Sequence, residues 1–322
     1  MKIIKKTISA SAPGKLILMG EHSVVYGHPA IITAVNHCIE VAVSEQIGQS
    51  EHLKKSGQSV DVRDVIVAPQ VKKPHFVEET LKFFREKYQD RHAIQSVIKL
   101  ETHAQFSDQD GLGSSSAVTV ATCKALSEFF GIGMSDRDIF DLSFKAVLNI
   151  QGSASGADIA VAVYGGTLYY KDRGSIIEKI SGENICLVIG NSGEKAPTIE
   201  LIQRVARLMK HEPEKVNDIF HNITELVEKG RTVILHNDLQ NLGKLMTENH
   251  QLLCELGVCT EKLNALVAAS MHAGALGAKL SGAGGGDNMF ALVTEETKQT
   301  VEKAIEQAGG RVIHVETNYA LI

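Results

Sequence analysis

The stretch Gly111-Leu112-Gly113-Ser114-Ser115-Ser116 decides how the chain is organised, because it joins a predicted strand to a predicted helix. Before it, the side chains of residues 96–102 alternate between apolar and polar, a period of two that predicts a half-buried strand. After it, apolar residues recur at helical spacing, at Ala117, Val118, Ala121, Ala125, Leu126 and Phe129. A loop of small residues therefore leads directly into a helix N-terminus.

This loop has the features of a phosphate-binding site. The first turn of a helix carries backbone N–H groups without intrahelical partners, and the helix macrodipole is positive there. Two glycines let the backbone approach a ligand, and three serines add hydroxyl groups, so the loop predicts a cradle for phosphate. The alternative is a serine-capped helix after a glycine turn without any ligand, and one short glycine motif does not distinguish the two.

Composition limits the class of protein. The chain has 322 residues, of which 43% are hydrophobic and 22% charged, enough for one large domain or two ordinary domains with buried cores. The net charge is −5 and no block of lysine or arginine is present, which argues against nucleic acid or an anionic membrane surface as the main partner. Because no apolar run has the length of a signal peptide or a membrane span, we expect a soluble, cytoplasmic protein.

The cysteines support the same expectation. There are five, an odd number, and none forms a C-x-x-C pair: Cys38, Cys123, Cys186, Cys254 and Cys259. Scattered cysteines of this kind indicate free thiols in a reducing cytoplasm rather than a disulfide framework or a zinc site.

Two more stretches of small residues carry candidate functional groups. In residues 12–22, a Pro-Gly turn is followed by Lys15, an apolar run, and then Glu21 and His22. Lys15 stands at the start of a predicted buried strand, so its ammonium group must reach either water or an anion. The alternative is a lysine whose stem covers apolar surface while its charge stays in water. Residues 281–287, Ser-Gly-Ala-Gly-Gly-Gly-Asp, follow another short predicted strand.

Asp158 follows a further run of small residues, 152–157, and begins an apolar segment. The small side chains before the carboxylate leave space beside it for a ligand. An aspartate that only caps a helix N-terminus is the alternative.

The periodicity of the remaining chain predicts strands and helices in both halves. In the first half we expect strands at 3–10, 16–19, 30–33, 39–43, 60–67 and 167–170, helices at 75–89 and 135–150, and a surface loop at 44–60. From about residue 172 we expect strands at 185–189, 277–280, 289–293 and 311–315, and helices within 196–256, after residue 260 and at 295–308. The order in this second half predicts an α+β domain with helices on one face of a mostly antiparallel sheet.

Neither glycine stretch matches the P-loop or the dinucleotide-binding fingerprint. Taken together and in this order, residues 12–22, 111–116 and 281–286 resemble the three motifs of the GHMP kinase superfamily, and the resemblance covers about residues 8–316. It implies an α+β fold with an N-terminal domain like ribosomal protein S5, at residues 1–171, and a C-terminal ferredoxin-like domain, at residues 172–322. The active site for ATP and substrate would lie in the cleft between them.

Within the superfamily, residues 20–30 and 249–253 are most similar to the mevalonate kinases. That likeness implies ATP-dependent phosphorylation of the 5-hydroxyl of mevalonate. Residues 146–148, 156–160 and 286–287 look more like phosphomevalonate kinase. We favour mevalonate, because a substrate phosphate calls for extra cations and residues 12–30 contain a single one, Lys15. Phosphomevalonate kinase and a non-catalytic ligand sensor with the same fold stay open as alternatives.

The resemblance also implies a role for individual residues. The ATP phosphates would be held by Gly111, Leu112, Gly113, Ser114, Ser115 and Ser116, and closed over by Ser281, Gly282, Ala283 and Gly284. Ser115 would reach Mg²⁺. Asp158 and Lys15 would be the catalytic residues. The substrate side would be formed by Lys15, Glu21, His22, Gly156 and Asp158.

The chemistry of these side chains agrees with those roles. Phosphoryl transfer to an alcohol depends on positioning and charge neutralisation. Asp158 can accept the hydroxyl proton, and Lys15 can neutralise the negative charge that builds up near the transferred group. His22 would donate a hydrogen bond to a polar substrate, with a satisfied core histidine as the alternative. A serine hydroxyl, phosphates and water form a plausible ligand set for Mg²⁺.

Two features depart from the superfamily pattern, and the oligomeric state is undecided. Many members carry a glutamate eleven residues before the catalytic aspartate as a second Mg²⁺ ligand, where this chain has Val147. Asp108 and Asp110, just before the phosphate loop, are candidates to replace it, and they also make the lead into that loop unusually acidic. The sequence does not choose between a monomer and a homodimer, the commonest closed assembly.

Overall fold

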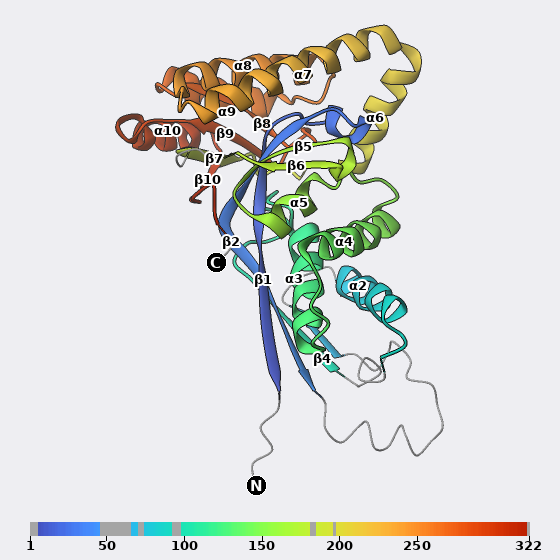
Figure 1. Cartoon of the computed structure of the whole chain (residues 1–322). Coiled ribbons are helices and arrows are strands. Elements are labelled where there is room, and N and C mark those ends of the chain that lie inside the picture. The colour runs from blue at the N-terminus through green and yellow to red at the C-terminus, as the bar shows by residue number, and fades with distance from the viewer. Residues whose placement is uncertain are drawn as a thin grey trace.

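The computed structural model describes residues 6–45, 66–69, 74–91, 98–180, 185–195 and 198–320, and of residues 66–69 and 74 only the backbone. These residues form two β-sheets with accompanying helices, which confirms the expected α+β class (Figure 1). Most of the loop expected at 44–60 and of the strand expected at 60–67 lies outside the described residues. Within the described residues, no helix has both the length and the apolar character needed to cross a bilayer.

The first sheet has six strands in the order β3-β4-β2-β5-β6, with β1 paired to β2. They are β1 Thr7–Met19, β2 Ala30–Glu45, β3 Ile66–Pro69, β4 Ile98–Ala104, β5 Thr167–Lys171 and β6 Ile176–Lys179. Neighbouring strands run antiparallel except β3 and β4, which are parallel. A short 3₁₀ helix, Ser23–Tyr26, lies between β1 and β2.

Strands β1 and β2 are longer than the sequence predicts. The turn expected at Pro13-Gly14 is wrong, because β1 runs through these residues and only its register against β2 shifts there. A proline cannot donate to a strand ladder, so it is tolerated within a strand at such an irregularity. The strands expected at 30–33 and 39–43 are likewise parts of one strand, β2.

Four helices pack together beside the first sheet. They are α2 Pro74–Lys87, α3 Ser114–Phe129, α4 Asp136–Gln151 and α5 Ala157–Tyr164. Helix α3 contacts β1 and β2 and is covered in turn by α2 and α4 (Figure 1). The helices predicted at 75–89 and 135–150 are confirmed, including the capping box between Ser135 and Asp138. The short helix α5 was expected only as an apolar segment.

The second sheet has the order β10-β7-β9-β8, and all its pairs are antiparallel. Its strands are β7 Leu187–Asn191, β8 Gly277–Ser281, β9 Asn288–Leu292 and β10 Arg311–Ile313. Its helices are α6 Thr198–His211, α7 Pro213–Leu235, α8 Leu239–Glu255, α9 Glu261–His272 and α10 Glu295–Gln307. Helices α8 and α9 pack on β8, and α10 packs on β7, as the α+β pattern predicted.

Helix α8 lies unusually close to strand β8 because two glycines meet there. A Cβ on Gly243 would stand 2.2 Å from the carbonyl oxygen of Leu276, and one on Gly277 would stand 2.0 Å from the carbonyl oxygen of Gly243. Any side chain at either position would push the helix away from the strand. This contact fixes β8, which leads directly into the glycine-rich residues 281–286.

The two sheets are connected at several points. Strand β1 contacts α7, α8 and β8, so the first sheet packs against elements of the second half. Strand β6 pairs with β5 in the first sheet, and the amide of Asn36 in β2 donates to the carbonyl of Glu316 near the C-terminus. The division expected at residues 171 and 172 remains a proposal. These contacts favour a boundary after β6, with the last described residues returning to the first sheet.

The expectation of free thiols is wrong for two of the five cysteines. Cys254 and Cys259 form a disulfide bond, whereas Cys38, Cys123 and Cys186 are free. The two sulfur atoms meet because α8 ends at Glu255 and α9 begins at Glu261, so a tight connection brings the flanking residues together. A five-residue separation matches none of the common cysteine motifs, which is why the sequence did not indicate the bond.

Candidate active site

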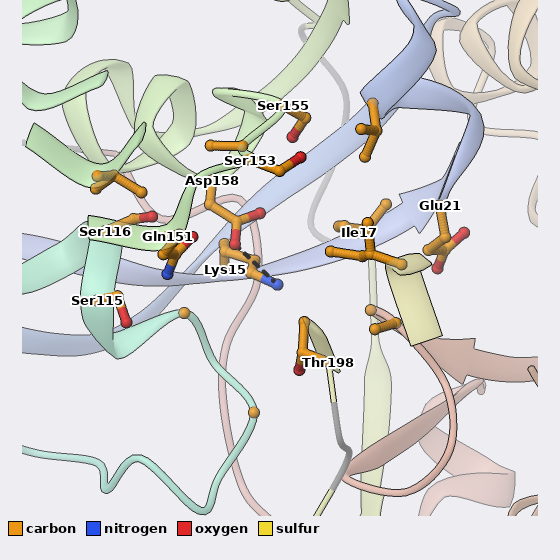
Figure 2. Close-up of a pocket in the computed structure, with 18 of the residues that line it drawn as sticks. Lys15, Ile17, Glu21, Ser115, Ser116, Gln151, Ser153, Ser155, Asp158 and Thr198 are labelled. Atoms are coloured by element: carbon orange, nitrogen blue, oxygen red, sulfur yellow. Dashed lines mark ion pairs between the residues drawn. The ribbon is translucent and has the colours of Figure 1, made fainter. Parts of the chain in front are cut away.

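A pocket of about 630 Å³ is lined by residues from both halves of the chain. The three motif-like stretches, residues 12–22, 111–116 and 281–286, all contribute to its wall, and Figure 2 labels residues of the first two. The lining includes every predicted site residue except Gly284: Lys15, Glu21, His22, Gly111, Leu112, Gly113, Ser114, Ser115, Ser116, Gly156, Asp158, Ser281, Gly282 and Ala283. The expected convergence of these distant segments is therefore present in the structure.

Lys15 and Asp158 form an ion pair in this pocket, with Lys15 Nζ 3.3 Å from Asp158 Oδ2 (Figure 2). The lysine side chain is 8% exposed and the aspartate side chain 33% exposed, so the carboxylate is the more accessible partner. Lys15 comes from β1, and Asp158 lies in the first turn of α5. The lysine is thus held against an anion, and the alternative of a snorkelling lysine does not describe it.

Strand β1 also contacts the phosphate loop directly. The Lys15 amide donates to the carbonyl of Leu112 at 2.9 Å. A Cβ on Gly113 would stand 2.9 Å from Lys15 Cε, so the lysine stem lies over this glycine. Gly113 also has a φ of 78°, which favours glycine. These contacts place the Lys15 ammonium beside the start of α3.

The start of α3 differs from a serine-capped helix. The N-cap residue is Gly113, which has no side chain, and Ser114 is already the first helical residue. Ser114 and Ser116 are buried, whereas Ser115 is partly exposed to the pocket. The alternative of a helix capped by a serine is therefore wrong for this loop, and the arrangement fits an anion bound at a helix N-terminus.

A tyrosine side chain contacts the loop before Asp158 and fixes its backbone. Tyr170 of β5 donates from its hydroxyl to the carbonyl of Ser155 at 2.5 Å, and a Cβ on Gly156 would stand 2.5 Å from the same hydroxyl oxygen. Gly156, with a φ of 85°, is the N-cap of α5. Asp158 is therefore not the capping residue, and the N-cap alternative is wrong. Ser153 and Ser155 lie beside Asp158 (Figure 2).

Glu21 is completely buried at the opposite side of the pocket. Its Oε1 forms an ion pair with Lys279 of β8, whose side chain is also fully buried. Its Oε2 has no partner among the described residues. Burial raises the pKa of the Glu21 carboxyl, and the Lys279 ammonium opposes that shift. Lys279 was not predicted as part of the site, because a lysine in a short apolar strand gives no indication of its partner.

His22 connects the same turn to the third glycine stretch. Its Nε2 lies 2.9 Å from the carbonyl oxygen of Ala283. Burial lowers the pKa of the His22 imidazole, so the ring is neutral near pH 7 and Nε2 carries the proton that it donates. The Nε2 atom of His22 is thus satisfied within the protein, as the alternative of a core histidine expects. A contact between His22 and the substrate stays a prediction.

The two aspartates before the phosphate loop, Asp108 and Asp110, have different surroundings. Asp108 lines the pocket and pairs with Lys195 at 3.2 Å. Asp110 is not part of the lining and instead pairs with Arg311 of β10 at 2.5 Å. Val147 does line the pocket and is buried, so the position of the usual glutamate is apolar here.

Several lining residues were not identified from the sequence. Asp287 follows the third glycine stretch and has a φ of 53°, and α6 contributes a strip of side chains: Thr198, Ile199, Ile202 and Gln203. The helical period of 198–211 was recognisable, but the period alone does not say which face meets a pocket. Gly284, by contrast, was expected here and lies outside the lining, packed against the carbonyl of Val258.

Comparison with known proteins assigns the chain to a family. Residues 75–166 match the N-terminal domain of the GHMP kinases, and residues 231–311 match their C-terminal domain. The chain is 37% identical to a mevalonate kinase of Thermococcus sibiricus over 95% of both chains.

Solved structures agree. The L. major mevalonate kinase in complex with R-mevalonate has a TM-score of 0.81 and 25% identity, covering 98% of this chain and 97% of the other. The Streptococcus pneumoniae phosphomevalonate kinase has a TM-score of 0.82 at only 19% identity, covering 97% and 99%, a likeness of fold alone. The chain belongs to the GHMP kinase superfamily and, within it, to the mevalonate kinases.

Proposed function

We propose that the chain transfers the γ-phosphoryl group of ATP to the 5-hydroxyl of mevalonate, giving 5-phosphomevalonate. The observation that carries the proposal is the Lys15–Asp158 pair, set in a pocket between the serine-lined start of α3 and the Glu21–His22 turn. On one side of this pair lies the N-terminus of α3, which can bind phosphates. On the other side lie the polar groups of Glu21 and His22, which can bind a small alcohol. The relatives of the chain support the same substrate.

The reaction follows from the geometry of these groups. Asp158, the more exposed partner of the pair, accepts the proton of the attacking hydroxyl as the oxygen–phosphorus bond forms. The Lys15 ammonium stays beside the transferred group and neutralises its charge. The first turn of α3 and residues 281–283 hold the remaining phosphates in place. Most of the catalytic effect then comes from positioning and electrostatics, as is usual for phosphoryl transfer.

The residues present fit a magnesium ion bound with ATP. Mg²⁺ prefers oxygen ligands and keeps several waters. The Ser115 hydroxyl and the carboxylates of Asp108 and Asp287 are oxygen donors in the pocket wall, and we propose Ser115 as the ligand, with Asp108 as the candidate second group. The ion would neutralise phosphate charge during transfer. Asp110 does not fit this role, because it is not among the lining residues of the pocket.

The cations of the pocket favour mevalonate over phosphomevalonate. Among the described lining residues, the lysines are Lys15 and Lys195, no arginine is present, and each lysine already pairs with an aspartate. The phosphate that phosphomevalonate already carries would therefore bind in this pocket without a cation of its own. Recognition of a phosphate normally requires such charge-assisted hydrogen bonds.

A direct comparison of substrates tests the assignment. Purified protein is mixed with ATP, Mg²⁺ and either mevalonate or phosphomevalonate, and ADP release is followed together with the phosphorylated product. We expect kcat/KM to be higher for mevalonate, with 5-phosphomevalonate as product. A higher kcat/KM for phosphomevalonate would support the sibling activity, and binding of ATP without turnover of either acid would support the non-catalytic sensor.

Two expectations from the sequence remain predictions. A homodimer is checked by sedimentation velocity of the purified chain. A cytoplasmic location is checked by fractionation of the producing cell. The cysteine argument for a reducing compartment no longer supports it, because Cys254 and Cys259 are bonded.

A further inference from the structure

The Cys254–Cys259 disulfide lies behind the third glycine stretch. Cys254 is in the last turn of α8, and Cys259 immediately precedes Thr260, the N-cap of α9. Both cysteines are half-buried. The bond closes the connection 255–258 into a small ring.

This closed connection contacts the glycine stretch through one carbonyl group. The amide of Gly285 donates to the carbonyl oxygen of Val258 at 2.8 Å. A Cβ on Gly284 would stand 2.2 Å from that oxygen, so the backbones touch there. The preceding residues 281–283 line the pocket on the proposed ATP side. The position of Val258 therefore sets the position of this wall of the pocket.

His250 connects the disulfide to the same wall from the other side. The amide of Leu280 in β8 donates to His250 Nδ1 at 3.3 Å, and His250 Nε2 lies 3.7 Å from Cys254 Sγ. Burial, together with the Lys279 charge, lowers the pKa of His250 to about 4, so the ring is neutral near pH 7. Because Nδ1 accepts, the single proton is on Nε2, the ring nitrogen near Cys254 Sγ. The side chain of Asn264 also hydrogen-bonds to His250 and lies close to the same sulfur atom.

We propose that Cys254–Cys259 is a reversible thiol–disulfide site that sets the affinity of the ATP pocket, with a dithiol as its reductant. One thiolate of the dithiol attacks Cys259 Sγ, the bond between the cysteines breaks, and Cys254 leaves as a thiolate beside the His250 N–H and then takes a proton. The second thiol of the reductant closes its own disulfide and releases Cys259 as a thiol. Two electrons and two protons pass from the dithiol to the cysteines.

Reduction opens the ring and frees the Val258 carbonyl from its fixed position. The wall formed by residues 281–283 then loses part of its preorganisation, and ATP must restore it on binding. The Lys15–Asp158 pair lies on other elements, β1 and α5, and the wall contacts the predicted substrate side through the hydrogen bond from His22 to Ala283. We therefore expect a smaller effect on the binding of mevalonate than on the binding of ATP.

The alternative for this cluster is a metal site. A ring nitrogen of His250 and the two sulfur atoms lie within 4.8 Å of one another, and Nε2 is the nitrogen 3.7 Å from Cys254 Sγ. A metal bound at Nε2 would move the ring proton to Nδ1, where it would face the N–H of Leu280, and two donors would oppose each other. The observed hydrogen bond therefore favours thiol–disulfide exchange.

The test measures ATP binding directly, because the proposal rests on the proposed ATP pocket. The full chain is prepared in the disulfide form and after reduction with dithiothreitol and removal of the reductant without air. Titration calorimetry without any alcohol substrate gives the dissociation constant of ATP. We expect it to rise about fivefold or more on reduction, the lower range of coupling between two sites. Kinetic assays should show a higher KM for ATP and a smaller change in the KM for mevalonate.

Linkage supplies a second readout that does not depend on catalysis. If reduction weakens ATP binding by some factor, ATP must favour the disulfide by the same factor. In a dithiothreitol redox buffer, saturating ATP should therefore shift the thiol–disulfide equilibrium toward the disulfide. Thiol titration of the unfolded chain reports the two forms, with three free cysteines in the disulfide form and all five after reduction.

Variants separate this effect from general reduction. Cys254→Ser/Cys259→Ser should bind ATP like the reduced chain and no longer respond to dithiothreitol, whereas Cys186→Ser, also half-buried, should respond like the wild type. Equal ATP affinity of the two forms would overturn the proposal, as would a double variant that still responds. A response abolished by a chelator would overturn it in favour of the metal site. Strong ATP binding without turnover of mevalonate would contradict the proposed function alone.

Discussion

At the scale of single residues, the buried pair Glu21–Lys279 joins the turn of Glu21 and His22 to strand β8. Both side chains are fully buried, and Lys279 also donates to the carbonyl of Leu280 at 2.7 Å and lies over the ring of Phe290. Burial alone lowers the pKa of Lys279, and Glu21 opposes that shift. Each charge is therefore tolerated because the other is present.

Removal of one member should cost far more than removal of both. We expect Lys279→Met to lower the free energy of unfolding by about 3–5 kcal/mol, because it leaves the Glu21 carboxylate buried without a cation. Glu21→Gln/Lys279→Met should recover most of this loss, since neither buried charge remains. Urea unfolding of the two variants and the wild type measures the difference. A double variant as unstable as the single variant would refute this account of the pair.

The sequence identified most site residues, but it gave their contacts only through the family resemblance. Residue patterns by themselves left open whether Lys15 meets an anion or snorkels and whether Asp158 binds a ligand or caps a helix, because no local pattern tells which distant side chains meet. The partner of Glu21 was missed for the same reason. Val147, which the resemblance puts where many members carry a glutamate, does line the pocket.

At the scale of elements, the third glycine stretch depends on its contact with the α8–α9 connection. Gly284 has a φ of 75° and no room for a side chain beside the Val258 carbonyl, whereas Gly282 has a φ of 86° and open space around it. An alanine at either position would have similar backbone strain. Only at position 284 would its methyl group also clash with the Val258 carbonyl.

This difference gives a matched pair of variants. Gly282→Ala should destabilise the ligand-free chain by about 1–2 kcal/mol from backbone strain alone. Gly284→Ala should cost clearly more, because the methyl group must also displace the Val258 carbonyl. Urea midpoints without ATP check the order. Equal destabilisation by the two variants would show that the α8–α9 connection moves away from the methyl group at no cost in stability, which would contradict this account.

The N-terminus of α4 should give an acid-dependent contribution to stability. Hydrogen bonds from the Lys87 ammonium and from Ser135 lower the pKa of Asp138 from 3.8 to about 2. A depressed pKa stabilises the fold above the unfolded value, so the contribution is complete above about pH 4 and is lost as the pH falls toward 2. Asp138→Asn should therefore lower the urea midpoint at pH 6 and have a smaller effect at pH 3. An effect that does not change with pH would contradict the pairing.

Elements with a strong local signal were predicted, and those set by distant contacts were not. Helices α2 and α4 have clear periods or caps, so the sequence placed them closely. The continuous β1 and β2 were divided at Pro13 and at polar residues, because local turn signals do not reveal that a partner strand continues. The Cys254–Cys259 bond depends on the angle between α8 and α9, which no spacing encodes.

At the scale of the whole molecule, function depends on two sheets that face one pocket. Strand β1 carries Lys15 toward the start of α3 and contacts β8, whose end forms the third glycine stretch. Residues from the beginning, the middle and the end of the chain therefore share one wall. The sequence predicted this arrangement through three motifs that are weak alone and specific as a set, while the boundary between the two halves stays a proposal.

The central claim is that Asp158 takes the proton of the alcohol during phosphoryl transfer. The most direct measurement is the single-turnover rate of Asp158→Asn with radiolabelled ATP and mevalonate, beside Asp141→Asn, an exposed aspartate paired with Arg137. The account predicts that Asp158→Asn slows transfer by about 10²–10⁴-fold while ATP binding and Asp141→Asn stay like the wild type. Transfer by Asp158→Asn within about tenfold of the wild-type rate would contradict it.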